Sequence, residues 1–165
     1  MIDFKLLPIL LCMMIFAGCG SNGCEGVVCG SRSNCVNGRC FCWDGYEGDN
    51  CEDLAADKYI GTWQVSPGCV QGFVPSHVSQ ITADPFGDPS IIVINNFMNS
   101  GLPLNANIFT DRTNRGNLIQ FQGQVVGANT VDGQGFYNPA SNQISLDIQY
   151  FGFNGGGQCT FIYFK

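Results

Sequence analysis

The chain has 165 residues, with 7 Lys+Arg against 13 Asp+Glu, so its net charge is −6. This balance excludes binding to a nucleic-acid backbone, because no group of cations is present to displace the counterions. An apolar content of 45% is that of a globular protein rather than of a disordered chain or an integral membrane protein. One His and few carboxylates leave little for acid–base chemistry, so an enzyme is not expected.

The N-terminus has the features of a targeting segment. Met1–Lys5 carries one Lys, and Leu6–Ala17 is an almost unbroken apolar run. Such a run spans only ~18 Å as a helix, which is too short for a hydrocarbon core of ~30 Å. A charged start, an apolar stretch and small residues predict a signal peptide over residues 1–18.

The end of this run resembles the bacterial lipobox. It consists of Phe16-Ala17-Gly18-Cys19, with Phe16 in the place where the lipobox prefers Leu. The resemblance implies that Cys19 is diacylated and becomes the mature N-terminus, so that residues 19–23 form a lipidated linker. The alternative is an ordinary secretory signal cleaved nearby, with Cys19 incidental.

Six cysteines crowd into the segment that follows. A segment this short with few large apolar side chains cannot bury a stable core, so covalent bonds must hold it together. Six cysteines permit fifteen pairings, and their spacing alone does not choose among them. A zinc site would need Cys-x2-Cys pairs, and the central pair here has a single intervening residue. The spacing is Cys24-x4-Cys29-x5-Cys35-x4-Cys40-x-Cys42-x8-Cys51.

The residues around these cysteines resemble an EGF-like domain over residues 24–52. The resemblance is carried by the run Cys40-Phe41-Cys42-Trp43-Asp44-Gly45-Tyr46, by Cys51, and by the hairpin dipeptide Asn37-Gly38. It implies the bridges Cys24–Cys35, Cys29–Cys40 and Cys42–Cys51. Residues 21–23 lack the acidic and amide pair of calcium-binding members, so calcium is not expected. The cysteine frame more often serves as a rigid spacer than as a receptor-activating ligand.

Residues 57–165 have a different composition and a β pattern. They hold 10 charged residues against 21 Asn+Gln and 15 aromatics, and apolar residues alternate with polar ones between turn signals. A succession of short strands without helices predicts an antiparallel meander, closed into a barrel or packed as a sandwich. The expected strands are 58–66, 77–83, 90–97, 104–110, 116–122, 124–128, 131–138 and 143–151, with 158–165 as a possible ninth.

The opening strand adds a second resemblance. Gly61-x-Trp63 is the Gly-x-Trp of lipocalin-like barrels, in which the Trp plugs one end. Together with the signal, the EGF-like module and two later cysteines, it is similar to a group of lipocalin-like bacterial surface lipoproteins. The resemblance implies a lipocalin-like β-barrel over residues 57–165. The biochemical role of that group is largely unassigned.

Few residues suggest catalytic chemistry, and neither a metal nor a cofactor is expected. His77 is the single histidine, and we interpret it as structural. The glycine-rich run 152–157 lies between two expected strands, so it reads as a hairpin loop rather than a phosphate cradle. Asp84, Asp88 and Asp111 fall in predicted turns, where Asp commonly caps the backbone.

Three hypotheses for binding remain open. In the first, large aromatic side chains fill the interior of the barrel and leave no room for a ligand. The side chains expected there are Trp63, Phe121, Phe136, Tyr150 and Phe161. An apolar ligand occupies the barrel in the second. In the third, a surface patch of Asn, Gln and exposed aromatics (Phe151, Phe153, Phe164) recognises a glycan or another protein.

Two cysteines remain outside the EGF-like segment and the N-terminal segment. An exported protein seldom leaves thiols free, so Cys69 and Cys159 are predicted to form a bridge.

The sequence as a whole predicts an exported, lipid-anchored protein of the cell surface or periplasmic side, with a non-enzymatic binding or display role. Its partners are then the membrane, through the anchor, and a glycan, protein or small apolar ligand. The alternative is a secreted, unanchored EGF-like protein that acts as a ligand or matrix component.

Overall fold

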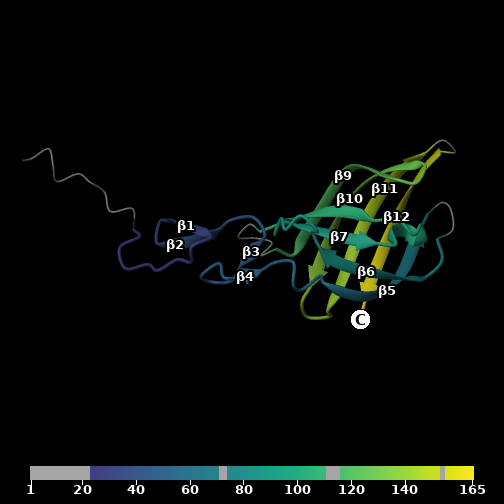
Figure 1. Cartoon of the computed structure of the whole chain (residues 1–165). Helices are drawn as coiled ribbons and strands as arrows, with labels where there is room; N and C mark the ends of the chain where they lie inside the picture. Colours follow the sequence, from purple (N-terminus) through teal and green to yellow (C-terminus); the bar gives the residue numbers. More distant parts are fainter. Residues whose placement is uncertain (1–22, 71–73, 111–115, 153–154) are drawn as a thin grey trace, which may run out of the picture.

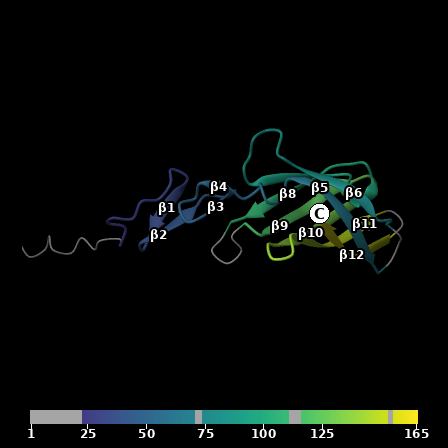
Figure 2. The same cartoon turned by 90° about the horizontal axis from the view of Figure 1, so that it is seen from below.

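The computed structural model of the chain describes residues 23–70, 74–110, 116–152 and 155–165. The predicted signal peptide, the predicted lipidation site Cys19, Asp111 and Phe153 lie outside the described residues. The described chain is mainly β, with a short disulfide-rich region followed by a closed barrel of antiparallel strands. The two views in Figure 1 and Figure 2 both place the disulfide-rich region at one end of the barrel.

The disulfide module, residues 24–54, consists of two small hairpins. β1(Ser33–Val36) pairs with β2(Arg39–Cys42), and β3(Tyr46–Glu47) pairs with β4(Asp53–Leu54). The turn residues Asn37 and Gly38 have φ angles of 50° and 76°, the left-handed conformation that an Asn-Gly hairpin turn requires. Three disulfides join the partners that the resemblance described above implies, namely Cys24–Cys35, Cys29–Cys40 and Cys42–Cys51.

The barrel is an up-and-down meander of eight strands. Each strand pairs with the next along the chain, and the last returns to the first, so no edge is left free for pairing with another chain. A short 3₁₀ turn, η2(Phe97–Asn99), lies between the third and fourth strands. The strands are β5(Gly61–Cys69), β6(His77–Ala83), β7(Ile91–Asn95), β8(Leu104–Phe109), β9(Leu118–Val126), β10(Asn129–Asn138), β11(Gln143–Gly152) and β12(Gly155–Phe164).

A fourth disulfide lies where the barrel closes. Cys69, the last residue of β5, and Cys159 on β12 stand directly opposite each other in the ladder, with their Cα atoms 4.0 Å apart. The bridge that the sequence predicts by elimination therefore joins the first barrel strand to the last.

The predicted strand boundaries need three corrections. The segments 116–122 and 124–128 are one strand, β9, because Gly123 marks a bulge opposite Asp132 rather than a turn. The strand predicted at 58–66 begins at Gly61 and continues to Cys69. The expected hairpin loop at 152–157 is shorter, since β11 runs to Gly152 and β12 starts at Gly155.

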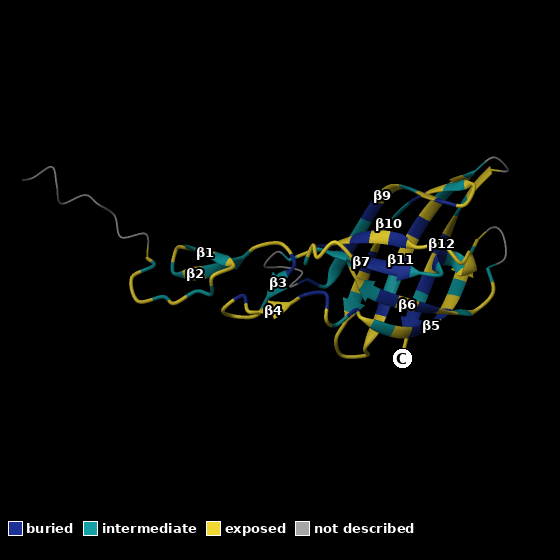
Figure 3. Cartoon of the chain, in the orientation of Figure 1, coloured by how far each residue is buried: buried dark blue, intermediate teal, exposed yellow. Residues whose placement is uncertain are grey.

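Side chains fill the interior of the barrel. Strand residues alternate between buried and exposed, as the banding in Figure 3 shows, and the buried ones converge on a single cluster. Glycines make room for the rings, since a methyl group on Gly133 would come within 2.6 Å of the Phe121 ring. Phe136, predicted as an interior ring, is 47% exposed because it falls on the outward-facing positions of β10. Five large side chains in the interior are completely or almost completely buried, namely Tyr59, Trp63, Phe97, Phe161 and Tyr163.

The segment between the module and β5 packs against the barrel. Ala55 and Ala56 are 0% and 4% exposed, and the Tyr59 hydroxyl donates a hydrogen bond of 2.8 Å to the carbonyl of Gly116. The Trp63 indole N–H donates to the Tyr59 carbonyl at 2.7 Å, and the Lys165 ammonium lies 4.3 Å from the centre of the Trp63 ring. This end of the barrel is therefore closed by the residues that precede its first strand and by the last residue of the chain.

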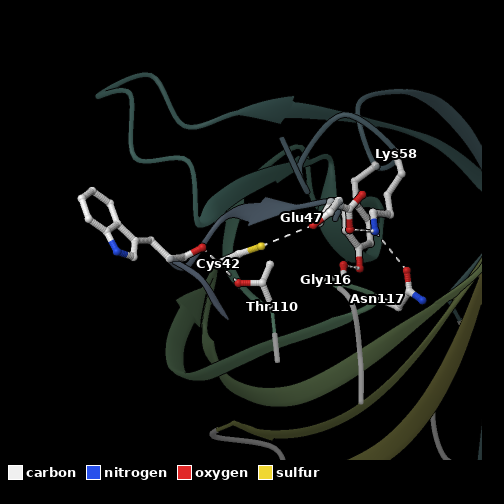
Figure 4. Close-up of polar contacts among 9 residues, drawn as sticks. Cys42, Glu47, Lys58, Thr110, Gly116 and Asn117 are labelled. Atoms are coloured by element: carbon white, nitrogen blue, oxygen red, sulfur yellow. Dashed lines mark hydrogen bonds and ion pairs between the residues drawn. The ribbon is translucent and has the colours of Figure 1, made fainter. Parts of the chain in front are cut away.

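Polar contacts hold the disulfide module to the same end of the barrel (Figure 4). The Lys58 ammonium lies 2.5 Å from the Glu47 carboxylate on β3 and donates to the Asn117 side chain at 3.1 Å. The Thr110 hydroxyl donates to the carbonyl of Trp43 at 3.4 Å. The loop before β7 approaches the module so closely that a side chain on Gly45 would overlap the Pro89 carbonyl.

Candidate binding groove

A groove of about 690 Å³ crosses the outer wall of the barrel, formed by residues of β8 to β12 and of the end of β5. Its volume falls within the range of about 300–1,000 Å³ that small-molecule sites occupy. Six of its lining residues carry side-chain amides, and they come from five different strands: Asn107, Gln120, Gln122, Gln134, Gln149 and Gln158.

The strand register aligns these groups into rows. Asn107 stands opposite Gln120, and Gln120 stands opposite Gln134. The same row continues through Asp147 to Thr160 on β12. Because the residues of one row lie on the same face at neighbouring strands, this row forms a continuous polar track around the outside of the barrel.

The side-chain amides of the groove are not used in hydrogen bonds among the described residues. None of the six side-chain amides hydrogen-bonds another group within the described part of the chain. Other Asn side chains of the barrel behave differently, since the Asn95 amide donates to the Gln80 carbonyl at 3.0 Å and the Asn96 amide donates to the Val78 carbonyl at 2.8 Å. The groove therefore presents donors and acceptors that the fold itself does not use.

Two carboxylates lie among the amides and are held in place by neighbours. The Gly123 backbone N–H donates to Asp132 at 2.5 Å, at the bulge in β9. The Thr160 hydroxyl donates to Asp147 at 2.7 Å, across the β11–β12 ladder. Each carboxylate keeps further lone pairs for an external donor. Asp132 and Asp147 are the charged residues of the eight barrel strands, and neither Lys nor Arg occurs within those strands.

Exposed rings lie beside the polar track. Phe109 and Phe136 are 40% and 47% exposed, and each stands opposite Leu118 in the next row of the same outer face. The side chains of Phe109, Leu118 and Phe136 thus form an apolar strip beside the amides of β8 to β10.

Three residues that the sequence interprets as structural, Asp84, Asp88 and His77, make local contacts. The Asp84 carboxylate accepts hydrogen bonds from the backbone N–H groups of Phe86 and Asp88, and Asp88 accepts from Ser90. The hydrogen bonds that the Ser90 hydroxyl and backbone N–H donate to Asp88 stabilise its ionised carboxylate and so lower the pKa of Asp88. The His77 imidazole contacts the Pro75 carbonyl at 3.0 Å. Among the described residues, no group of three or more His, Cys, Asp or Glu side chains is placed to hold a metal ion.

The predicted aromatic patch does not form as one surface. Phe151 and Phe164 are exposed, but Phe164 stands opposite Gln143 and Phe151 stands opposite Gly156. Eight residues of β11 separate these two positions, a distance of about 26 Å along the strand. The third member, Phe153, lies outside the described residues.

The abundance of Asn and Gln is evident from the sequence, but the position of the groove is not. Alternation along a strand indicates which residues share a face, and Gln120 and Gln122 already follow that pattern. The register between strands, which brings Gln134 and Asp147 beside them, has no equally clear signal in the sequence.

Comparisons with known proteins add no family to these observations. No protein-family model matches the chain, and a search of curated proteins finds no match. Within the part of the chain that the structure describes, no helix is long and apolar enough to cross a membrane.

Proposed function

We propose that the protein is exported, is anchored to a membrane by a lipid on Cys19, and binds a ligand at the cell surface without transforming it. In this proposal the disulfide module is an EGF-like spacer, and the barrel is a lipocalin-like domain that presents the outer groove.

Four disulfides support an oxidising compartment, because such bonds persist in exported proteins and are rare in the cytosol. The contacts of Lys58 with Glu47 and of Thr110 with Trp43 support a spacer that holds the barrel in a fixed orientation.

The observation that carries the binding role is the set of unpaired amides on the outer wall. The buried rings of Trp63, Phe97 and Phe161 occupy the space that an apolar ligand would need. Binding on the outside is therefore favoured over binding within the barrel.

The anchor is tested by replacing Cys19 with Ser. Since stable attachment needs two or more acyl chains, the variant is expected to move from the membrane fraction to the soluble fraction with all four disulfides intact. Cys12→Ser is the matched control, because it removes the other N-terminal cysteine and should leave the protein in the membrane fraction. Intact mass should show a chain that begins at Cys19 and carries lipid. A soluble wild-type protein with an unmodified N-terminus would instead support the secreted EGF-like alternative.

A further inference from the structure

We propose that the outer groove of the barrel is a binding site for an uncharged oligosaccharide. This proposal rests on the binding role proposed above and names the class of ligand. Its basis is the combination of unpaired amides, fixed carboxylates and exposed rings on one face.

The amides match the chemistry of sugar hydroxyls. A hydroxyl group both donates and accepts hydrogen bonds, and a side-chain amide offers an acceptor oxygen and two donor hydrogens. Gln134 and Gln149 point to the outer face from neighbouring strands, with no internal hydrogen bond to break within the described residues. A hydroxyl-rich ligand would gain contacts there without displacing any bond of the fold.

The charges exclude an anionic ligand. Among the described residues that line the groove, Asp132 and Asp147 are the charged ones, and none is Lys, Arg or His. A phosphate or an acidic sugar would bring a negative charge beside these carboxylates without a cation to balance it. A neutral ligand instead gives each carboxylate a hydroxyl donor, and a hydrogen bond to a charged acceptor is stronger than one between neutral groups.

The carboxylates are held ready for binding. The bulge at Gly123 fixes Asp132, and the Thr160 hydroxyl fixes Asp147. A site whose polar groups are already oriented loses less conformational entropy when a ligand binds. β-bulges commonly redirect a side chain near functional sites, which fits the place of Asp132 at the rim of the track.

The shape suits a chain rather than a single small molecule. The polar row runs around the curved wall of the barrel from Asn107 on β8 to Gly68 on β5. Five strand-to-strand steps of about 4.8 Å give this row a length of about 24 Å. Phe109 and Phe136 border it as exposed rings, and the apolar C–H face of a sugar packs against aromatic rings.

The test uses the full-length protein, purified without a sugar-based detergent. The probes are maltohexaose, cellohexaose, xylohexaose and chitohexaose, with an oligogalacturonate as the acidic comparison. Binding is followed by titration calorimetry and by the side-chain amide resonances of the protein in NMR spectra. At least one neutral probe is expected to bind and to shift the resonances of Gln134 and Gln149.

Substitutions assign the binding to the groove. Gln134→Ala and Asp147→Asn are each expected to weaken binding of that probe by about three- to tenfold, the loss of one hydrogen bond. Gln143→Ala is the matched control, because Gln143 is an exposed amide of β11 outside the groove and its loss should leave the affinity unchanged.

Three results would overturn the proposal: no binding of any neutral probe, equal or tighter binding of the oligogalacturonate, or affinities unaffected by Gln134→Ala. A protein ligand whose binding is lost in Gln134→Ala, while every neutral probe fails, would assign the groove to protein recognition instead. None of these outcomes alters the fractionation result for Cys19→Ser. The oligosaccharide proposal and the lipid-anchor proposal can therefore be rejected independently of each other.

Discussion

Two buried tyrosines differ in what their hydroxyl groups contact. The Tyr59 hydroxyl donates to the Gly116 carbonyl at 2.8 Å, whereas the Tyr163 hydroxyl has no hydrogen-bond partner among the described residues. A buried polar group without a partner costs free energy, and a net hydrogen bond stabilises a fold by about 1 kcal/mol.

Replacing these tyrosines with Phe should therefore change stability in opposite directions. Tyr163→Phe is expected to raise the free energy of unfolding by about 1 kcal/mol, and Tyr59→Phe is expected to lower it by a similar amount. Urea denaturation of the two variants and the wild-type protein measures both effects. A loss of stability in Tyr163→Phe would show that its hydroxyl is bonded in solution.

The same two side chains predict how the protein responds to alkali. Burial raises the pKa of Tyr59, helped by the negative charge of Glu47 and by Tyr137, and burial alone raises the pKa of Tyr163. In the unfolded chain both groups ionise near pH 10. The folded state keeps their protons longer, so stability is complete below about pH 10 and is lost as the pH rises above it.

The expected slope above pH 10 is about 1.4 kcal/mol per pH unit for each buried tyrosine. Urea midpoints measured at increasing pH test this dependence, and Tyr163→Phe should reduce the slope by about half. A free energy of unfolding that stays constant to about pH 12 would contradict it.

At the scale of elements, the contact between the disulfide module and the barrel depends on the closeness of two loops. Gly45 has a φ of +84°, and a Cβ atom there would come within 2.6 Å of the Ser90 nitrogen and overlap the Pro89 carbonyl. A left-handed φ and a backbone neighbour both disfavour any other residue at this position.

Gly45→Ala is expected to separate the module from the barrel and to lower stability by about 1–3 kcal/mol. Hydrogen exchange should then speed up at Ala55 and Tyr59, whose backbone and side chain pack at this junction. Gly26→Ala is the matched control, because Gly26 also has a positive φ, of +79°, but no atom within 4 Å of the added methyl group. Equal effects in both variants would attribute the loss to backbone strain alone.

The elements also show how far the sequence could predict the fold. Alternating apolar residues and turn signals located most strands. The pairing of the first six described cysteines came from the family resemblance of the residues around them, because their spacing alone left fifteen pairings open. The division of β9 at Gly123 was wrong because a glycine in a strand looks like a turn until its cross-strand partner is known. The burial of Ala55 has no clear signal in the sequence, since small residues reveal burial only when the packing partner is in place.

The candidate groove was less predictable than the barrel, for a related reason. Period-two alternation gave the outward direction of Gln134, but the groove arises from the relative register of five paired strands. Local sequence carries little information on register between distant strands such as β8 and β12.

For the whole molecule, the Cys69–Cys159 bond has the largest expected effect on stability. It closes a chain segment with a sequence separation of 90 residues, and the chain-entropy estimate for such a loop is about 4–5 kcal/mol, before any strain. The double variant Cys69→Ala with Cys159→Ala should lose about that much free energy of unfolding, measured by denaturation of the barrel.

The double variant Cys24→Ala with Cys35→Ala serves as the control. Its bond spans a separation of only 11 residues within the disulfide module, so the unfolding midpoint of the barrel should change little. If both double variants lowered the midpoint of the barrel equally, the loop-length explanation would be wrong.

The pairing of β5 with β12, which closes the barrel and is called the seam below, also affects how the barrel resists a pulling force. A pull transmitted along the chain from the disulfide module enters the barrel at Gly61, the first residue of β5, and tends to peel that strand from its neighbours. Peeling proceeds along β5 towards Cys69, where the covalent bond to Cys159 stops it. Tension can therefore open one end of the seam, but β5 stays attached to β12 until the disulfide is reduced.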